Sequence, residues 1–358
     1  MSRTHFFYSV SERKNVLILG KSGKTICKTA IEAVLHTKCK SYDRQTFTQF
    51  NDEPGVHVFD IPIHHKTVFQ KFRRFVDPNI VIVTNIGEGH LVYQSNTVNY
   101  FQMIKSYLKS LPKETVFILN KDDDLVSQLA EELHEYQIIK FGLNKKADIY
   151  ASEIVQNGPK GIHFKLNNVF QIRCPIYEFN HIYNILSAIA LARIFNVSVE
   201  TIQKNIETHF SVPEGRGNLV HLNAVSIIND TYKNTKLNVA TAAQTLVSFK
   251  NYYKRMIMVI GEIDAEGANS YSIHVNSGHF LSALPIDIVM TVGEKTKPIY
   301  DVMTNFPFQE RIIIHANNVQ EAVMNLCLFL DEGDCILLKS NEASGLTQFI
   351  EILQKNLN

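Results

Sequence analysis

A hexapeptide near the start of the chain, GKSGKT, carries residue types suited to binding phosphate. It follows an apolar run and opens a helical pattern. Backbone amides, the Lys24 charge and the Thr25 hydroxyl would therefore form a cradle for phosphate and Mg²⁺. Gly20 and Gly23 keep bulky side chains out of this turn. The signature is shorter than the common phosphate loop, because Ile18 stands where that loop has its first glycine. The alternative is a glycine-containing helix cap with an exposed lysine.

Two further polar residues, Asp60 and His90, follow strand-like runs. Asp60 ends the run VHVFD, and His90 lies in TNIGEGHL, after the run that ends at Thr84 and Asn85. Ligands of open α/β sheets gather beyond the carboxyl ends of the strands. These side chains would then hold a second cation beside Mg²⁺ at Thr25, although Mg²⁺ prefers oxygen ligands. On these residues alone, a solvent-exposed loop histidine is the favoured interpretation.

The elements that must position these residues alternate in type along the first 140 residues. Alternating β-branched runs and helical patterns predict a parallel sheet with helices on both faces. We expect strands at 16–19, 56–60, 80–86, 115–120 and 137–141, and helices that start near Lys24, Lys66, Thr97 and Asp124. Three more runs, separated by turn residues, predict a small antiparallel annex: ADIYASEIVQ, GIHFKLNN and VFQIRCPIY.

A break in the pattern divides the chain into two predicted domains. Two helices are expected over residues 181–209, and the segment SVPEGRGN then interrupts them with proline and glycine. We place the boundary there, which gives domains over residues 1–212 and 213–358. Strand–helix alternation resumes with VSIIND, RMIMVIG, DIVMTVG, RIIIHA and CILLKS, and predicts a second α/β domain.

Composition narrows the function classes. The 358 residues, 45% of them apolar and 20% charged, are typical of a globular protein with two domains. A net charge of +1 argues against a broad nucleic-acid-binding face. Five cysteines without CxxC spacing indicate reduced thiols, and no apolar run approaches the roughly 18 residues of a membrane span. We therefore predict a cytoplasmic protein with no nucleic-acid or membrane partner.

The order of the motifs is more specific than any one of them. The series LGKSGKT, TNIGEGHL, FILNKDD, FNHIYNILSAIALA, GRGN and IIND resembles the Mur ligase family from about Asn15 onward. These are ATP-dependent amide-forming ligases of cell-wall precursor synthesis. TNIGEGHL, NDTY and VIGEIDAEG are most similar to the MurF type, which adds a dipeptide. The resemblance implies a P-loop ATP-binding domain and a C-terminal Rossmann-like α/β domain that carries the incoming amine.

The resemblance also implies a reaction and a first set of site residues. A small-molecule carboxylate would be joined to an amine, an amino acid or peptide, through an acyl phosphate, with ATP and Mg²⁺ as cofactors. Lys24 would contact the terminal phosphates, and Thr25 would bind Mg²⁺ beside Gly20 and Gly23. Asp60 and His90 match family metal ligands, and Asp60 is a shorter carboxylate than the family glutamate. Catalytic roles would fall to Lys24, His90 and Lys233.

Further ATP-binding positions follow from the same resemblance. Asn120 matches an element near the nucleotide, Asn184 the adenine side, and Arg216 a hinge arginine that meets ATP. Asp230 matches an aspartate on the ribose or phosphate side, and Lys233 a residue that faces the γ-phosphate. The alternatives are a bond within the helix for Asn184, a surface charge for Arg216 and a helix cap for Asp230.

Several positions depart from the family pattern. The metal-bridging lysine, often carbamylated, falls in register on Ile104, with Lys105 next to it. The family's lysine-glycine-serine-arginine becomes KSNE at residues 339–342, which reverses a charge where an incoming carboxylate is often bound. The adenine-side His-Asn pair is swapped to Asn-His at residues 180–181. We expect His274 and Lys339 to be solvated.

Only residues 1–14 precede the resemblance, so we expect the family's N-terminal UDP-binding domain to be missing. The acid substrate would then not be a standard UDP-muramoyl peptide, unless a partner protein replaces that domain. The alternative function is a nucleotide-binding, Mur-ligase-like subunit with weak or no ligase activity that works with a partner. A generic P-loop ATPase or kinase would leave the downstream motifs unexplained.

Overall fold

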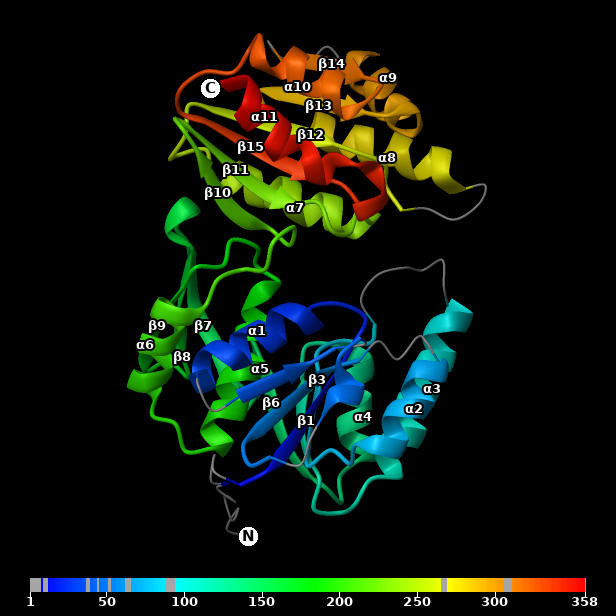
Figure 1. The fold of residues 1–358 in the computed structure, drawn as a ribbon, viewed down its shortest axis with the longest axis vertical. Coiled ribbons are helices and arrows are strands. Elements are labelled where there is room, and N and C mark those ends of the chain that lie inside the picture. Colours follow the sequence, from blue (N-terminus) through cyan, green and yellow to red (C-terminus); the bar gives the residue numbers. More distant parts are fainter. Residues whose placement is uncertain are drawn as a thin grey trace. The chain divides into compact units, whose positions relative to one another are not determined.

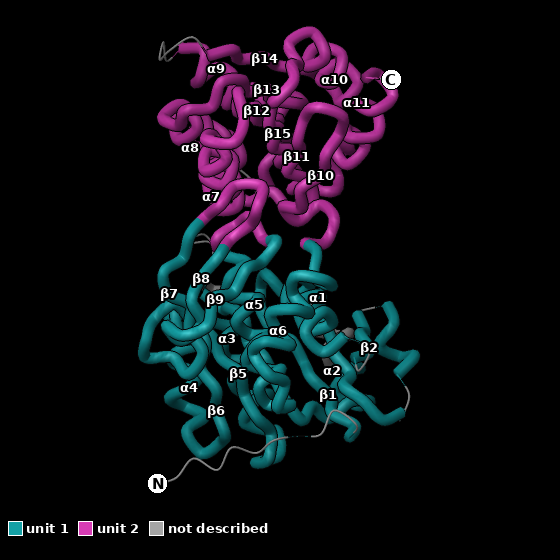
Figure 2. The backbone as a smooth tube through the Cα atoms, turned by 90° about the vertical axis from the view of Figure 1, so that its left-hand side faces the viewer, with its two compact units in different colours: residues 1–155, 163–175, 180–211 teal, residues 156–162, 176–179, 212–358 magenta. Residues whose placement is uncertain are grey.

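The computed structural model describes residues 8, 12–36, 39–43, 45–50, 53–61, 66–87, 94–264, 269–305 and 311–357. The chain forms two compact units (Figure 2). Unit 1 comprises residues 1–155, 163–175 and 180–211, and unit 2 comprises residues 156–162, 176–179 and 212–358. The predicted domains, 1–212 and 213–358, stay a prediction, and each unit is described by itself.

Unit 1 is built on a large sheet. Its strand order over the described residues is β2-β3-β1-β4-β5-β6-β7-β8-β9. All neighbouring pairs from β2 to β7 are parallel. The strands are β1 Lys14–Leu19, β2 Cys39–Tyr42, β3 Val56–Asp60, β4 Ile80–Val83, β5 Val116–Asn120, β6 Gln137–Gly142, β7 Ile149–Gln156, β8 Ile162–Leu166 and β9 Phe170–Cys174.

Helices cover both faces of this sheet (Figure 1). They are α1 Lys24–Leu35, α2 Lys66–Phe75, α3 Gln94–Lys109, α4 Asp124–Glu132, α5 His181–Ile194 and α6 Val199–His209. Leu17 and Leu19 of β1 share a core with Phe72 of α2, Ile104 of α3 and Leu129 of α4. On the other face α1 packs against α5 and α6. The predicted parallel sheet with two helical layers is confirmed.

Some strands of unit 1 differ from the prediction. Strand β4 ends at Val83 rather than at residue 86, because Thr84 and Asn85 turn towards the loop after β1. Strand β2 was not predicted, since the short segment CKSY lacks a β-branched run. The three annex strands are present as β7, β8 and β9, and they extend the main sheet through the parallel pair β6–β7.

Unit 2 contains a second α/β sheet with the order β10-β11-β15-β12-β13-β14 over the described residues. Strand β10 is antiparallel to β11, and the other neighbouring pairs are parallel. The strands are β10 Asn218–Leu222, β11 Val225–Asp230, β12 Arg255–Ile260, β13 Ile288–Val292, β14 Ile312–Ala316 and β15 Asp334–Lys339. This arrangement agrees with the predicted second α/β fold.

Two helical layers also enclose the sheet of unit 2. The helices are α7 Lys236–Ser248, α8 Ser270–Ser282, α9 Lys297–Asn305, α10 Val319–Cys327 and α11 Phe349–Leu357. Val323 of α10 and Phe349 of α11 share one core with Val259. Leu246 of α7 and Leu281 of α8 share the opposite core. Strand β15 is the last strand in the sequence, yet it lies inside the sheet, between β11 and β12.

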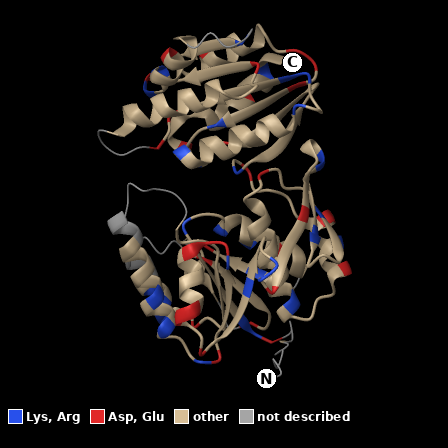
Figure 3. Ribbon diagram, turned by 180° about the vertical axis from the view of Figure 1, so that it is seen from behind, with Lys and Arg blue, Asp and Glu red and all other residues tan. Residues whose placement is uncertain are grey.

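Charged residues of both signs are spread along the chain. Lys and Arg are interspersed with Asp and Glu along both units (Figure 3), as expected from 36 basic and 35 acidic residues. None of the helices within the described ranges has the length and apolar character that crossing a membrane requires.

Candidate functional site

Residues 20–25 form a glycine turn at the junction of β1 and α1, and we call it the phosphate turn after the ligand predicted for it. Gly20 has a φ angle of 150° and Gly23 one of 78°, in the region that favours glycine. Gly23 is the N-cap residue of α1, and no side chain among the described residues caps this helix. The first amide groups of a helix lack partners within it and carry a partial positive charge. The turn therefore has the build of an anion site.

Close contacts explain why both positions are glycine. A Cβ atom on Gly20 would lie 2.0 Å from Thr84 Oγ1, and one on Gly23 would lie 2.4 Å from Asn184 Oδ1. Asn184 comes from α5 and is buried. The structure thus brings Asn184, predicted on the adenine side of a nucleotide, directly against the phosphate turn.

The strand order places this turn where ligands collect in α/β sheets. Strands β2 and β3 lie on one side of β1, and β4 and the strands after it lie on the other. The order in which strands are added to the sheet therefore switches between β1 and β4. Open α/β sheets bind ligands at such a point, outside the carboxyl ends of the strands. The loops after β1 and β4 form this edge.

Thr25 and Asp60 meet at the same edge. The Thr25 hydroxyl donates a hydrogen bond to Asp60 Oδ2 at 3.0 Å. Lys24 Nζ donates to the Gly20 carbonyl oxygen at 3.0 Å. The Thr25 hydroxyl and the Asp60 carboxylate are oxygen ligands of the kind that Mg²⁺ prefers. Water and phosphate oxygens would complete its coordination. The shorter Asp60 side chain therefore reaches Thr25.

The second metal site cannot be built from the described residues. His90, its predicted ligand, lies outside them. Within the described ranges, no three His, Cys, Asp or Glu side chains converge as a metal site would require. Ile104, at the family's bridging-lysine position, is fully buried in the core. Lys105 forms an ion pair with Glu132 of α4, and the hydrogen bonds from Lys105 and Lys109 hold the pKa of Glu132 below its ordinary value.

Asn120 braces the loop that follows β4. Its amide donates to the Thr84 carbonyl oxygen at 2.9 Å, and its Oδ1 accepts from the Asp122 amide at 3.0 Å. Asp123 Oδ2 accepts from the amides of Ile86 and Gly87 at 3.0 and 2.9 Å. Both polar ends of Asn120 therefore contact the protein, and its amide group holds Thr84.

Thr84, Asn85 and Tyr100 are parts of this site that the sequence analysis did not assign. The Thr84 hydroxyl lies 2.9 Å from the Ser22 carbonyl oxygen, and Lys21 Nζ lies 5.8 Å from the centre of the Tyr100 ring. Burial raises the pKa of Tyr100, against the lowering effect of the Gly20 amide. The sequence did offer one indication for Thr84 and Asn85, because both follow a predicted strand at its carboxyl end, where ligands gather.

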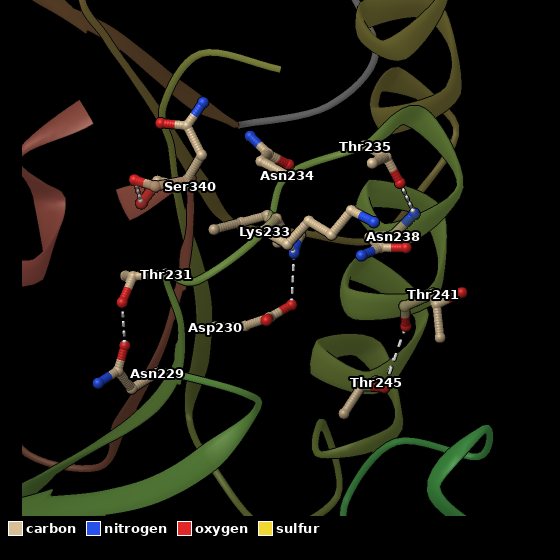
Figure 4. A network of polar contacts seen from close by, with 12 residues as sticks. Asn229, Asp230, Thr231, Lys233, Asn234, Thr235, Asn238, Thr241, Thr245 and Ser340 are labelled. Carbon is tan, nitrogen blue, oxygen red and sulfur yellow. Dashed lines mark hydrogen bonds and ion pairs between the residues drawn. The ribbon is translucent and has the colours of Figure 1, made fainter. Parts of the chain in front are cut away.

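Asp230 and Lys233 lie close together in unit 2 (Figure 4). A third residue, Lys339, bonds to both of them. Lys339 Nζ donates to Asp230 Oδ2 and to the Lys233 carbonyl oxygen, both at 2.6 Å. Lys339 is fully buried, so the expectation that it is solvated is wrong. A buried ammonium group requires charged or polar partners, and the end of β11 supplies both. The Lys233 side chain itself is exposed.

A second carboxyl group lies in the same cluster. Burial raises the pKa of Glu178, against the lowering effects of Lys339 and of a hydrogen bond with Asp230. A Cβ atom on Gly217 would lie 2.6 Å from Glu178 Oε1, so Gly217 makes room for this side chain. The helix-cap alternative for Asp230 does not apply, because Thr235 caps α7 through the Asn238 amide.

Arg216 and His274 also have defined surroundings in unit 2. The Arg216 guanidinium carbon lies 3.6 Å from the centre of the Tyr232 ring, which is a cation–π contact. His274 is fully buried, and its expected exposure is wrong. Its Nε2 accepts from the Ile263 amide at 3.1 Å, so Nδ1 carries the proton and donates to the Ser270 carbonyl oxygen at 2.7 Å. These two bonds give the buried ring its partners.

The chain is an α/β protein with two sheets, and the first sheet carries a strand–glycine turn–helix unit. Residues 44–192 match the model of the Mur ligase middle domain. This part of the chain is therefore similar to the middle domain of Mur ligases, and the relatives below are ligases of the same kind.

Relatives and solved structures agree with this class. The UDP-N-acetylmuramoyl-tripeptide--D-alanyl-D-alanine ligase of Bacillus subtilis is 24% identical over 353 residues, which cover 94% of this chain and 75% of that protein. The ligase of the same name from Buchnera aphidicola is 24% identical over 301 residues, and the match spans 79% of this chain and 64% of that protein.

Two MurF structures share the fold. MurF from Acinetobacter baumannii superposes with a TM-score of 0.83 at 21% identity, over 96% of this chain and 77% of that one. The MurF ligase of Thermotoga maritima in complex with ADP gives a TM-score of 0.78 at 17% identity, over 97% and 80%. The predicted α/β fold class is therefore confirmed.

Proposed function

We propose that the chain is an ATP-dependent carboxylate–amine ligase that acts through an acyl phosphate and releases ADP and phosphate. The observation that carries this proposal is the phosphate turn, in which Gly23 opens α1 and Thr25 meets Asp60. The names of the relatives, which are ligases of peptide precursors, support the same reaction class.

The proposal assigns each predicted site residue a role. Lys24 and Lys233 would neutralise phosphate charge, and His90 would bind a second metal ion. Thr25 and Asp60 would hold Mg²⁺, which when bound supplies further charge neutralisation to the phosphates. ATP contacts are proposed for Gly20, Gly23, Lys24, Thr25, Asn120, Asn184, Arg216 and Asp230.

The reaction activates a carboxylate, which is otherwise a poor acyl donor. A carboxylate oxygen attacks the γ-phosphorus, the bond from that phosphorus to the β–γ bridging oxygen breaks, and ADP leaves. The amine nitrogen then attacks the acyl carbon, phosphate departs with the acyl oxygen, and the nitrogen loses a proton. Phosphoryl transfer asks the protein mainly for positioning and charge neutralisation. We assign both tasks to the phosphate turn and Lys24.

The amine substrate is proposed to differ from that of the relatives. Glu342 is exposed and negatively charged where the family pattern has arginine. Asn341, its neighbour, donates its amide to Asp264 Oδ1 at 2.6 Å. A carboxylate on the incoming amine would meet these negative charges. A phosphate-release screen with amino acids, short peptides and cell-wall precursors would identify both substrates.

A second candidate function is a nucleotide-binding subunit that works with a partner protein and has little ligase activity. Ile104 in the core and the ion pair between Lys105 and Glu132 favour it, because they leave the bridging-lysine position without a lysine. It predicts ATP binding without amine-dependent phosphate release. Any acceptor-dependent ADP formation by the pure protein would exclude it.

The proposed function is tested by Lys24→Ala, with Lys28→Ala one helical turn further along α1 as the matched control. We expect K24A to lose ADP formation by about a hundredfold or more, since it removes a charge from the reacting phosphates. K28A should keep the wild-type rate, and both should keep the wild-type circular dichroism spectrum. Full ATP turnover by K24A would contradict the proposal, as would a wild-type protein that does not bind ATP with Mg²⁺.

A further inference from the structure

The side chain of Asn85 lies inside the phosphate turn and bonds to it from both ends. Its Oδ1 accepts hydrogen bonds from the amides of Lys21 and Ser22, at 3.0 and 3.1 Å. Its Nδ2 donates to the carbonyl oxygen and the hydroxyl of Ser22, both at 3.0 Å. The Lys21 amide also lies 3.3 Å from the Asn85 carbonyl oxygen.

We infer that Asn85 is a positioning residue for nucleotide binding, which holds the outer half of the phosphate turn and leaves the inner half to the phosphates. This inference rests on the proposed function and assigns it a residue outside the predicted set. Asn85 acts through Lys21 and Ser22, so it is not a catalytic residue.

The inference rests on which backbone amides of the turn already bond to the protein. The amides of Lys21 and Ser22 point to Asn85 Oδ1, so they face a protein acceptor. A phosphate bound at this turn would instead accept hydrogen bonds at the start of α1, the helix that Gly23 caps. Asn85 thereby separates the amides that bond to the protein, those of Lys21 and Ser22, from the amides proposed to bond to a phosphate.

Thr84 strengthens the same attachment. Its hydroxyl reaches the carbonyl oxygens of Leu19 and Ser22, at 3.2 and 2.9 Å, and its amide donates to Leu19 at 2.9 Å. The absence of a side chain on Gly20 permits this approach. The turn is therefore held by the two residues that follow β4, and of these Asn85 bonds to the amides of Lys21 and Ser22.

Asn79, at the opposite end of β4, provides a matched control. Its Oδ1 accepts a hydrogen bond from the Asn15 amide at 2.9 Å, so it also joins β4 to β1 through a carboxamide. That end of the sheet lies away from the phosphate turn. A merely structural role for Asn85 would make the two asparagines equivalent in every measurement.

The test measures ADP binding to the full chain by isothermal titration calorimetry with Mg²⁺ present. We expect Asn85→Ala to weaken ADP binding by about tenfold or more, because the turn loses its acceptor and its donors. Asn79→Ala should lower the melting temperature and leave ADP affinity within about twofold, a change too small to reflect a lost hydrogen bond.

A second variant covers the case in which N85A does not fold. Asn85→Asp keeps the size of the side chain and the acceptor oxygen, loses the donors to Ser22 and adds a negative charge near the phosphates. We expect N85D also to bind ADP about tenfold more weakly, with a difference from wild type that narrows as salt is added. Wild-type ADP affinity in a folded N85A or N85D protein would overturn the inference while the proposed function stands. A wild-type protein that does not bind ADP would overturn both.

Discussion

The ammonium group of Lys339 lies 2.6 Å from Asp230 Oδ2 and 2.6 Å from the carbonyl oxygen of Lys233. One buried cation thus joins the carboxyl ends of β15 and β11 and holds the loop that carries Lys233. Asp230 and Lys233 both belong to the predicted site. Lys339, which links them, was expected to be exposed to solvent but is buried.

Lys339→Met is expected to destabilise the protein strongly. It removes the ammonium and leaves the Asp230 carboxylate buried without it, which typically costs about 3–5 kcal/mol in the free energy of unfolding. Urea denaturation followed by circular dichroism measures this change. The control is Lys113→Met, which breaks the exposed ion pair with Glu135 and should change stability far less. Equal effects of the two substitutions would show that the buried pair has no special role.

Gly23→Ala is expected to damage the phosphate turn for two separable reasons. Its φ of 78° disfavours a side chain by about 1–2 kcal/mol, and the added Cβ would collide with Asn184. The double variant Gly23→Ala with Asn184→Ala removes the collision and keeps the backbone strain. Thermal melts should place the double variant between G23A and N184A. If the double variant loses as much melting temperature as the two single variants together, a collision between the added Cβ and Asn184 does not contribute to the destabilisation by G23A.

Thr25→Val is expected to remove the Mg²⁺-dependent part of nucleotide binding. The wild-type protein should bind ADP more tightly with Mg²⁺ than with EDTA, because Thr25 and Asp60 offer oxygen ligands. In T25V the two affinities should become equal within about a factor of two, since the hydroxyl ligand is lost. Thr208→Val, on the exposed side of α6, serves as the control. A retained Mg²⁺ effect in T25V would place the metal elsewhere.

Glu178→Gln is expected to change how stability depends on pH. Burial raises the pKa of Glu178 in the folded protein, so the folded state binds its proton more tightly than the unfolded state. The stability that this proton provides is complete below the ordinary glutamate pKa of about 4.3, and it is lost as pH rises through the folded pKa. Relative to wild type, E178Q should therefore gain stability with increasing pH. Urea midpoints measured from acidic to neutral pH test this trend, and parallel curves would contradict it.

The fold was accessible from sequence because buried parallel strands carry continuous apolar runs. VLIL and IVIV lie within β1 and β4, and VFILN is β5. Thr25 and Asp60 could be paired for a related reason, since neighbouring parallel strands end at one edge of the sheet. Short β2 has no such run, so nothing in its four residues indicated a strand.

The surroundings of polar residues were harder to predict. Lys339 and His274 were expected in solvent, and both are buried because distant parts of the chain supply their partners. Asn85 was visible at a strand end, but its four bonds to Lys21 and Ser22 depend on how β4 lies beside β1. Such pairings arise from tertiary structure, which local spacing does not encode.

The absent side chain at Gly20 constrains how this turn can evolve. Thr84 Oγ1 lies only 2.0 Å from the place of a Cβ atom, the backbone of Asn85 lies 3.3 Å from it, and the φ of 150° strains any side chain there. A smaller residue at position 84 would therefore not be enough to admit alanine at position 20, and we expect glycine to be retained there.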